Sequence, residues 1–262
     1  METGLANRVA IVAAGSQGLG RAAALALAAE GAHVAICARG KEALEQTSAT
    51  VRERFRVRVY TEPVDVRDTP AVDEFVKNVD RQFGRIDVCI TNAGGPPAKG
   101  FLETTDEDWD QAFASNLRSA AAFARAVIPY MQRNRWGRII TISSITVRQP
   151  QPQLVLSNAV RAGVMGLVRS LANEFGKDGV LINNVAPGYT ATERLKELSE
   201  RRASVSGQTE EEIERTWIEQ IPIQRLGRPE EVADAILWLA SERASFVTGQ
   251  TILVDGGMYK GL

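Results

Sequence analysis

The sequence predicts an α/β fold built on a mostly parallel β-sheet. Short apolar runs rich in β-branched residues alternate with stretches of helical periodicity along all 262 residues. Such alternation is typical of right-handed crossovers between parallel strands. A glycine-rich turn follows the first run, and no linker or repeat divides the chain. We therefore expect a doubly wound, seven-stranded sheet with helices on both faces, in a single domain covering residues 1–262.

Each expected strand is followed by an expected helix. The strands are expected at residues 9–14, 34–38, 57–66, 86–94, 138–143, 180–188 and 250–257. The helices are expected at residues 21–30, 41–54, from 69 onward, in two stretches over 106–134, and at 157–177 and 229–240. Two helix starts carry their own signal, because Pro70 and Pro229 stand at a first helical position.

The segment 190–227 interrupts this rhythm. It is polar and charged, and a Ser-Val-Ser-Gly-Gln-Thr break separates two helical pieces. So long an insertion in a compact domain is usually functional or mobile. We interpret it as a lid over a substrate, with solvated surface helices as the alternative.

Composition limits the classes of partner. The 31 basic and 32 acidic residues leave no net field that would attract nucleic acid or an anionic membrane. No signal peptide or membrane span is expected. Cys37 and Cys89 lie in apolar strands, which suits buried thiols in a reducing cytoplasm. The lone His33 is expected at a loop or strand edge, and no metal site is expected.

The turn after the first strand predicts a dinucleotide site. A glycine-rich turn that opens a helix brings backbone N–H groups and a partial positive charge to a diphosphate. An ordinary tight turn is the alternative. The residues expected to bind here are Gly15, Ser16, Gln17, Gly18, Leu19 and Gly20.

The residue after the second strand favours NADP(H). An acid at this place binds a ribose 2′-hydroxyl, whereas an arginine accommodates a 2′-phosphate. Here the strand ends at Ala38-Arg39, with no acid. A guanidinium offers a planar set of donors to a phosphate. We expect NADP(H); if Arg39 is only a surface residue, NAD(H) remains possible.

Further motifs cover almost the whole chain. They are Asp65-Val66, Asn92-Ala93-Gly94, Asn116 in a helix, Ser143-Ser144, Pro187-Gly188, and the C-terminal run from Gly227 to Gly257. With these motifs the chain resembles the short-chain dehydrogenase/reductase family, and is similar in particular to 3-oxoacyl-acyl-carrier-protein reductases. The resemblance implies a Rossmann fold, an oxidoreductase that interconverts a carbonyl and an alcohol, and a homo-oligomer, tetramer or dimer, with its interface on the helices of residues 106–134 and 157–177.

The resemblance also implies roles for matching residues. Ser144 would polarise the substrate carbonyl, and Asn116 would hold a relay water. Ala14 stands where the family usually has a glycine, and we expect the turn to survive this change. The residues implied to contact the cofactor beyond the glycine turn are Asp65, Val66, Asn92, Ala93, Gly94, Arg161, Pro187, Gly188 and Thr190.

The catalytic tyrosine and lysine of the family are missing. Ser157 stands at the tyrosine position, 13 residues after Ser144, and Arg161 at the lysine position. A serine hydroxyl is a poor acid with a short reach, and an arginine cannot pass on a proton. We expect Ser144, Arg161 and Ser157 to bind the substrate oxygen, with the proton coming from water through Asn116. Tyr189 is a less favoured substitute phenol.

Other outcomes stay open. The chain could bind the dinucleotide with little or no redox turnover, as a sensor or an inactive partner subunit, or it could run a different reaction on the same scaffold. The loop at residues 148–153 contains two prolines and is expected at the mouth of the pocket. Its polarity is a weak indication of a polar small-molecule substrate.

Overall fold

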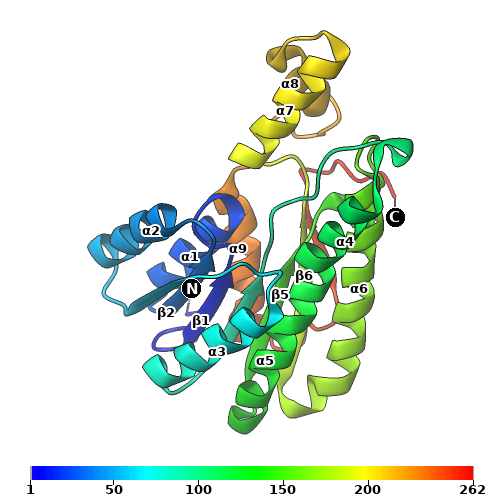
Figure 1. Ribbon diagram of the computed structural model, residues 1–262. Helices are drawn as coiled ribbons and strands as arrows, with labels where there is room; N and C mark the ends of the chain where they lie inside the picture. The colour runs from blue at the N-terminus through cyan, green and yellow to red at the C-terminus, as the bar shows by residue number, and fades with distance from the viewer. Residues whose placement is uncertain (1, 262) are drawn as a thin grey trace.

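A seven-stranded parallel sheet lies at the centre of the molecule in the computed structural model, which describes residues 2–261 (Figure 1). The strand order is β3-β2-β1-β4-β5-β6-β7, and every neighbouring pair is parallel. The expected doubly wound sheet of seven strands is confirmed. The strands are β1 (Val9–Ala13), β2 (His33–Ala38), β3 (Val59–Pro63), β4 (Val88–Thr91), β5 (Gly137–Ile142), β6 (Val180–Pro187) and β7 (Thr251–Val254).

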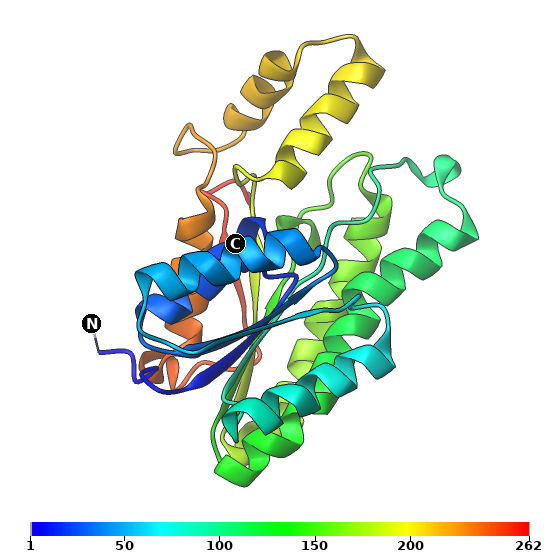
Figure 2. The same ribbon diagram turned by 60° about the vertical axis from the view of Figure 1, so that its left-hand side comes forward.

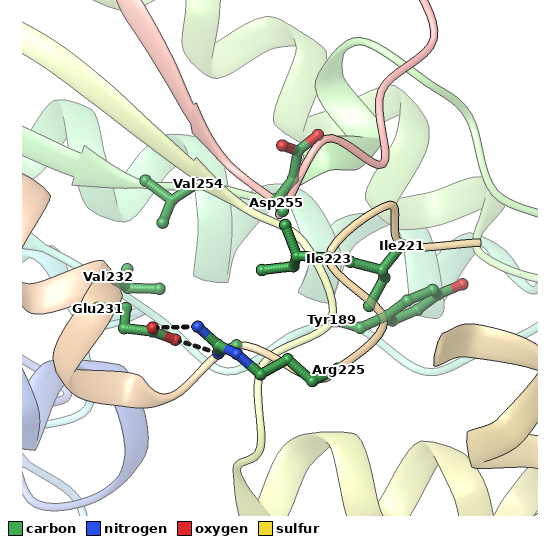
Figure 3. Close-up of a pocket in the computed structure, with 10 residues that line it drawn as sticks. Tyr189, Ile221, Ile223, Arg225, Glu231, Val232, Val254 and Asp255 are labelled. Carbon is green, nitrogen blue, oxygen red and sulfur yellow. Dashed lines mark hydrogen bonds and ion pairs between the residues drawn. The ribbon is translucent and has the colours of Figure 1, made fainter. Parts of the chain in front are cut away.

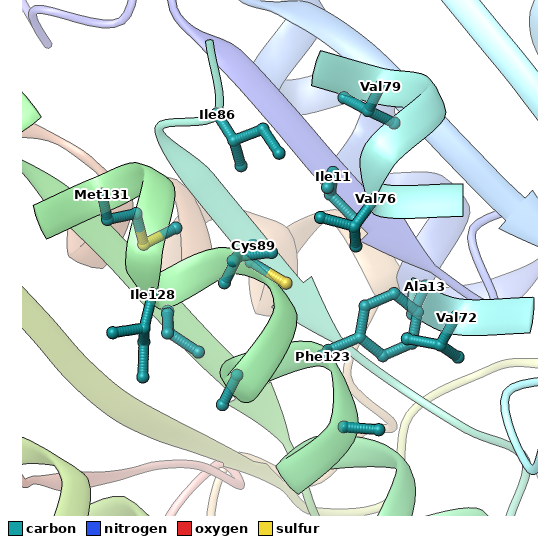
Figure 4. Close-up of a cluster of buried hydrophobic side chains, with 14 of the residues drawn as sticks. Ile11, Ala13, Val72, Val76, Val79, Ile86, Cys89, Phe123, Ile128 and Met131 are labelled. Atoms are coloured by element: carbon teal, nitrogen blue, oxygen red, sulfur yellow. The ribbon is translucent and has the colours of Figure 1, made fainter. Parts of the chain in front are cut away.

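Helices cover both faces of the sheet (Figures 1 and 2). One face packs against α1 (Gly18–Ala29), α2 (Lys41–Arg54) and α9 (Pro229–Ala240). The other packs against α3 (Thr69–Phe83), α5 (Ser119–Asn134) and α6 (Val155–Phe175), with α4 (Asp106–Phe113) beside α6. Figure 4 shows part of this second core, where Phe123 and Met131 of α5 meet Cys89 of β4.

The strands are apolar on both faces because both faces are covered. In β1, Val9 and Ile11 point into one core while Ala10 and Val12 point into the other, as the two-residue period of a strand requires.

Cys37 is fully buried, and this burial raises the pKa of its thiol to about 12. Burial likewise raises the pKa of Cys89. Neither thiol is ionised near neutral pH, so both serve as small core residues.

Several element bounds differ from the expected ones. Helix α1 begins at Gly18 rather than at residue 21, and α6 begins at Val155 rather than at 157. Five strands, β1, β3, β4, β6 and β7, are shorter than the expected runs, whereas β2 begins one residue earlier, at His33, and β5 is shifted by one residue to Gly137–Ile142. Between α4 and α5 the helix widens into a π-helical turn, Ala114–Arg118, which contains Asn116. Such π-bulges often stand at functional sites.

The segment 190–227 contains two helices, α7 (Glu193–Ser206) and α8 (Glu210–Ile218), which project beyond the sheet (Figures 1 and 2). Leu195, Ile213 and Trp217 form a small apolar core between them. The pair thus has its own packing and lies over the edge of the sheet where the strands end. None of the described helices combines the length and the apolar character that a membrane crossing needs.

Candidate dinucleotide and active site

The expected site residues gather at one edge of the sheet. The loops after β1, β4, β5 and β6 all leave the carboxyl ends of parallel strands. The chain runs outward in one direction from β1 to β3 and in the other from β4 to β7, so the strand order reverses between β1 and β4. Ligands of open α/β sheets bind in the crevice outside such a reversal.

The glycine turn has a backbone that only small residues permit. Gly18 has a left-handed φ of 53°, and a Cβ on Gly20 would lie 2.4 Å from the Ala14 carbonyl oxygen. A Cβ on Gly15 would lie 2.6 Å from Ile36 Cγ2. Ala14 itself has a φ of 47°, a conformation that glycine adopts without strain and alanine does not. The turn survives the alanine, as expected, at an energetic cost.

The start of α1 fits a diphosphate. Its N-cap residue, Gln17, makes no side-chain capping bond, and the first turn contains no acidic residue. The N–H groups of that turn are therefore free to bind an anion. Opposite Gly18 lies Thr192, whose Cγ2 would be 3.7 Å from a Cβ on that glycine. Thr192 therefore lies directly beside the turn at the start of α1.

The expected adenosine end is more exposed. Arg39 follows β2 directly and is exposed to solvent. Asp65 pairs with Arg67 at 2.5 Å, and hydrogen bonds from Arg67 lower the pKa of Asp65, with a smaller contribution from the charge of Arg39. Arg39 is thus near the predicted adenine residues and is free of any ion pair within the part of the chain that the structure describes. Asn92 Nδ2 donates to the Ala14 carbonyl at 3.4 Å and links the two loops.

Ser144 and Ser157 occupy one hydroxyl cluster. Ser144 Oγ accepts from the backbone N–H of Thr146 at 3.2 Å, and Thr146 Oγ1 lies 3.2 Å from Ser157 Oγ. Ser144 is half-buried, whereas Ser157 and Thr146 are buried. The hydroxyl of Ser144 still has its proton to donate to a substrate oxygen. Thr146 is a member of this cluster that the sequence motifs did not indicate.

Arg161 lies one helical turn after Ser157 and reaches the end of β5. Its Nη1 donates to the Ile142 carbonyl at 3.3 Å, while its buried Nε has no hydrogen-bond partner. Burial, and secondly the charge of Arg194, lower the pKa of Arg161 to about 10. The guanidinium therefore stays charged at neutral pH. It lines a small cavity together with Asn92, Ala93, Asn116, Ser119 and Thr141.

Asn116 is positioned by the π-helical turn. Its side chain is buried, and its Nδ2 donates to the Ala112 carbonyl at 3.2 Å and to Ser115 Oγ at 2.8 Å. Since Asn116 and Arg161 line the same cavity, the structure brings together the two residues that were expected to hold a water and a charge.

The loop after β6 uses its residues differently from the expectation. The hydroxyl of Thr190 is buried and donates to the Gly188 carbonyl at 3.2 Å, whereas Thr192 faces the glycine turn. Arg194 of α7 donates to the Pro96 carbonyl at 2.6 Å. Thr192 and Arg194 were missed, although Thr192 has a local signal as the N-cap of α7.

Tyr189 is committed to other contacts. Its ring stacks on Trp217 at a centroid distance of 4.9 Å, and its hydroxyl donates to Gln151 Oε1 at 3.4 Å. Burial raises the pKa of Tyr189, which makes the phenol a weaker acid. The structural packing therefore accounts for Tyr189 without a catalytic role. Gln151 belongs to the expected loop, which is non-helical at its two prolines, as predicted.

A second cavity lies beside the returning end of the segment 190–227 (Figure 3). Tyr189, Ile221 and Ile223 form its apolar wall. Arg225 and Glu231 pair across it, with contacts of 2.6 and 2.8 Å. Hydrogen bonds from Arg225 lower the pKa of Glu231 to about 2. This pair joins the returning end of the segment 190–227 to the start of α9.

Known proteins resemble this chain along its whole length. The family model described as enoyl-(acyl carrier protein) reductase matches residues 13–259. The 3-oxoacyl-[acyl-carrier-protein] reductase FabG of Staphylococcus epidermidis is 33% identical over 258 residues, which are 97% of this chain and 99% of that protein. FabG of Chlamydia trachomatis is 34% identical over 254 residues, 97% of this chain and 98% of that one.

Solved structures agree in fold. L-sorbose reductase of Gluconobacter frateurii, complexed with NADPH and L-sorbose, superposes with a TM-score of 0.95 at 32% identity and 100% coverage of both chains. An NADPH-bound short chain oxidoreductase of Pseudomonas aeruginosa, whose description names an atypical catalytic center, has a TM-score of 0.89 at 35% identity, covering 97% of this chain and 98% of that one. With its motifs, its sheet and these relatives, the chain belongs to the short-chain dehydrogenase/reductase family of nicotinamide-dependent oxidoreductases, as its sequence predicted.

Proposed function

We propose that this protein is an NADP(H)-dependent oxidoreductase that interconverts a carbonyl and an alcohol on a polar small molecule, with water in place of the missing phenol as proton donor. The observation that carries the proposal is the meeting, at one sheet edge, of an uncapped glycine turn, a free Ser144 hydroxyl and a charged Arg161. Binding of NADPH by two of the similar structures supports the choice of cofactor.

The residues present fit the dinucleotide. The α1 N-terminus and Thr192 would hold the diphosphate, Arg39 the 2′-phosphate, and Asp65 and Val66 the adenine. Gly94, against which a Cβ would meet nothing within 4 Å, leaves room for a ribose beside Asn92 and Ala93. Pro187 and Gly188 would flank the nicotinamide. When bound, the cofactor supplies the hydride.

The protein's own groups must stabilise the charge that develops on the substrate oxygen. Ser144 would donate a hydrogen bond to that oxygen, and the charge of Arg161 would favour an alkoxide in a site of low dielectric. Ser157 is bonded to Thr146 and would act mainly by keeping the cluster in place. The cavity beside Asn116 and Arg161 has room for about a single water molecule. That water would deliver the proton.

The segment 190–227 would act as the lid of this site. Its first helix is joined to the β4 loop by the bond from Arg194 to Pro96, and its return is held by the pair of Arg225 and Glu231.

We further propose a homo-oligomer in the cytoplasm. Exposed small residues on α6, among them Ala162, Gly163 and Gly166, would permit close packing of a second copy, and buried free thiols suit a reducing compartment.

A dinucleotide-binding protein without turnover is the second candidate, favoured by the absence of the tyrosine. Titration with NADPH and NADH, followed by assays of nicotinamide absorbance with a panel of ketones, aldehydes and alcohols, separates the two. Turnover supports the enzyme, and binding without turnover on any compound supports the second candidate.

In an active enzyme, Ser144→Ala should lower kcat by roughly 100-fold, as loss of an oxyanion donor does elsewhere. Ser143→Ala is the control, and an unchanged rate in Ser144→Ala would exclude the assigned role.

A further inference from the structure

Arg194 of α7 lies over the loop that follows β4. Its Nη2 donates to the Pro96 carbonyl at 2.6 Å. A Cβ on Gly95 would lie 3.0 Å from Arg194 Nε and 3.3 Å from Arg194 Nη2, so the guanidinium rests directly against the backbone of this glycine. Arg194 also lies near enough to Arg161 for its charge to contribute to the lowered pKa of that residue. The side chain of Arg194 is therefore turned toward the site.

The two segments that Arg194 joins both meet the glycine turn after β1. Thr192, the N-cap residue of α7, has its Cγ2 3.7 Å from the position of a Cβ on Gly18. The β4 loop meets the same turn, because Asn92 Nδ2 donates to the Ala14 carbonyl. Arg194 follows Thr192 by two residues, and the glycine that it contacts follows Asn92 by three. The guanidinium thus connects the two segments that flank the expected diphosphate position.

The other groups expected around the diphosphate are neutral. Neither the glycine turn at residues 15–20 nor the β4 loop at residues 92–94 contains a charged residue. A diphosphate is doubly anionic, whereas the N-terminus of α1 offers only roughly half a positive charge. Arg21 is close in sequence, but its Nη2 donates to Thr50 Oγ1 of α2 at 3.4 Å and is directed away from the turn. Arg194 is the cation that the fold brings to this part of the site.

The guanidinium of Arg194 is accessible and is not committed to a strong interaction. Its side chain is 37% exposed, and it pairs at 3.1 Å with Glu197, whose side chain is 64% exposed. Ion pairs between exposed groups contribute little to stability. The bond to the Pro96 carbonyl uses one of the five N–H donors of an arginine and leaves others for an anion. An exchange of Glu197 for a phosphate oxygen would therefore cost little.

We propose that Arg194 binds the diphosphate of the dinucleotide from the side of α7. This inference rests on the proposed function and adds a cofactor-binding residue that the sequence motifs did not indicate. Charge-assisted hydrogen bonds from a guanidinium suit phosphate oxygens. Since Arg194 belongs to α7, its contact with the diphosphate would fix the base of the segment 190–227 over the bound cofactor. Cofactor binding and the position of this segment would thereby be coupled.

Calorimetric titrations with NADPH and NADH test this assignment. Arg194→Gln should lower both affinities by the same factor, roughly 10-fold, because both nucleotides contain the diphosphate. The loss should shrink when NaCl is raised from about 0.05 M to about 0.5 M, since salt screens an exposed charge. Arg194→Lys keeps the charge and should recover most of the lost affinity. Arg201→Gln removes an exposed charge farther along α7 and, as the control, should change neither affinity.

Unchanged affinities in Arg194→Gln would overturn the inference. So would a loss confined to NADPH, a loss that salt does not reduce, or a lysine variant no better than the glutamine variant. Circular dichroism establishes that each variant is folded. If the glutamine variant is not, Gly95→Ala decides the matter, because its Cβ displaces the guanidinium and should weaken binding of both nucleotides equally. If the unaltered protein binds neither nucleotide, the proposed function falls together with this inference, whereas normal binding by Arg194→Gln removes the inference alone.

Discussion

The glycine turn after β1 and the segment from β5 to α6 lie at the same edge of the sheet, yet substitution has affected them differently. The turn has exchanged one glycine for Ala14, and its backbone keeps the left-handed conformation with a φ of 47°. The second segment has exchanged two side chains, at Ser157 and Arg161. Backbone N–H groups hold a phosphate whatever the side chains are, so the turn tolerates the change. Proton transfer depends on one side chain with a suitable pKa, so the two changes in the second segment alter the chemistry.

The largest expected effect comes from a substitution in the glycine turn, the region that we expect to be intact. In Gly20→Val, the new Cβ would lie 2.4 Å from the Ala14 carbonyl and 3.0 Å from Asn92 Nδ2, and neither the backbone nor the linked loop can move away easily. We expect NADPH affinity to fall by roughly 100-fold or more, measured by calorimetry on folded protein. Gly176→Ala, at a φ of −58° with open space around the Cβ, should bind normally. Normal binding by Gly20→Val would show that the turn is not the phosphate site.

A smaller effect concerns the adenosine end of the same region. Arg39→Ala removes a charge-assisted hydrogen bond to the 2′-phosphate, which is worth about 1.5–3 kcal/mol. NADPH affinity should fall by roughly 10- to 100-fold, while NADH affinity stays the same. Parallel titrations with both nucleotides measure the ratio. If both affinities fall equally, or neither falls, Arg39 does not bind the 2′-phosphate.

The altered region should respond weakly at the position of the missing tyrosine. Ser157→Ala removes the contact with Thr146 but no group that we expect to donate a proton. The rate should fall by no more than about tenfold, in keeping with a neutral hydrogen bond worth about 0.5–1.5 kcal/mol. Steady-state kinetics measure this, with Ser144→Ala as the strong comparison. A loss as large as that of Ser144→Ala would identify Ser157 as the proton donor after all.

The pH dependence of kcat should lack the contribution of the tyrosine that the family usually has at the position of Ser157. Burial lowers the pKa of Arg161 only to about 10, so its charge persists through neutral pH. We expect kcat to be nearly constant between about pH 6 and 9 and to fall as the pH approaches that value, because the cation is then lost. A pH–rate profile measures this. A clear pKa within the flat range would point to a different proton donor, and Arg161→Lys should shift the high-pH limb.

The smallest expected effect is a change in stability on restoring the glycine of the turn. Ala14→Gly should stabilise the protein by about 1 kcal/mol, because the observed φ of 47° strains alanine but not glycine. For a chain of this size the midpoint of thermal unfolding should rise by about 2–4 °C. Differential scanning calorimetry measures the shift. Ala120→Gly, in the regular helix α5, is the control and should destabilise. A destabilising Ala14→Gly would show that the turn is unstrained.

Much of the fold was predictable because its signals are local. The seven strands, the start of α2 at Lys41 and that of α9 at Pro229 follow from residues close together in the chain. The start of α6 was placed two residues late, since the packing of Val155 and Leu156 under α4 extends the helix backward. The glycine turn and Ser144 could also be singled out as candidate site residues, because their motifs are compact.

The sequence by itself determined the parallel fold, the glycine-rich turn after the first strand and the loss of the tyrosine and lysine, since each depends on residue type and short spacing. Only the tertiary structure decided that Thr192 faces Gly18, that Thr146 contacts Ser157, and that Arg161 is buried with one edge unpaired. These facts arise where strands and loops far apart in the chain meet. The energy of a buried charge depends on its partners and on its access to solvent. Both are set by how strands and loops pack together and not by any local run of residues.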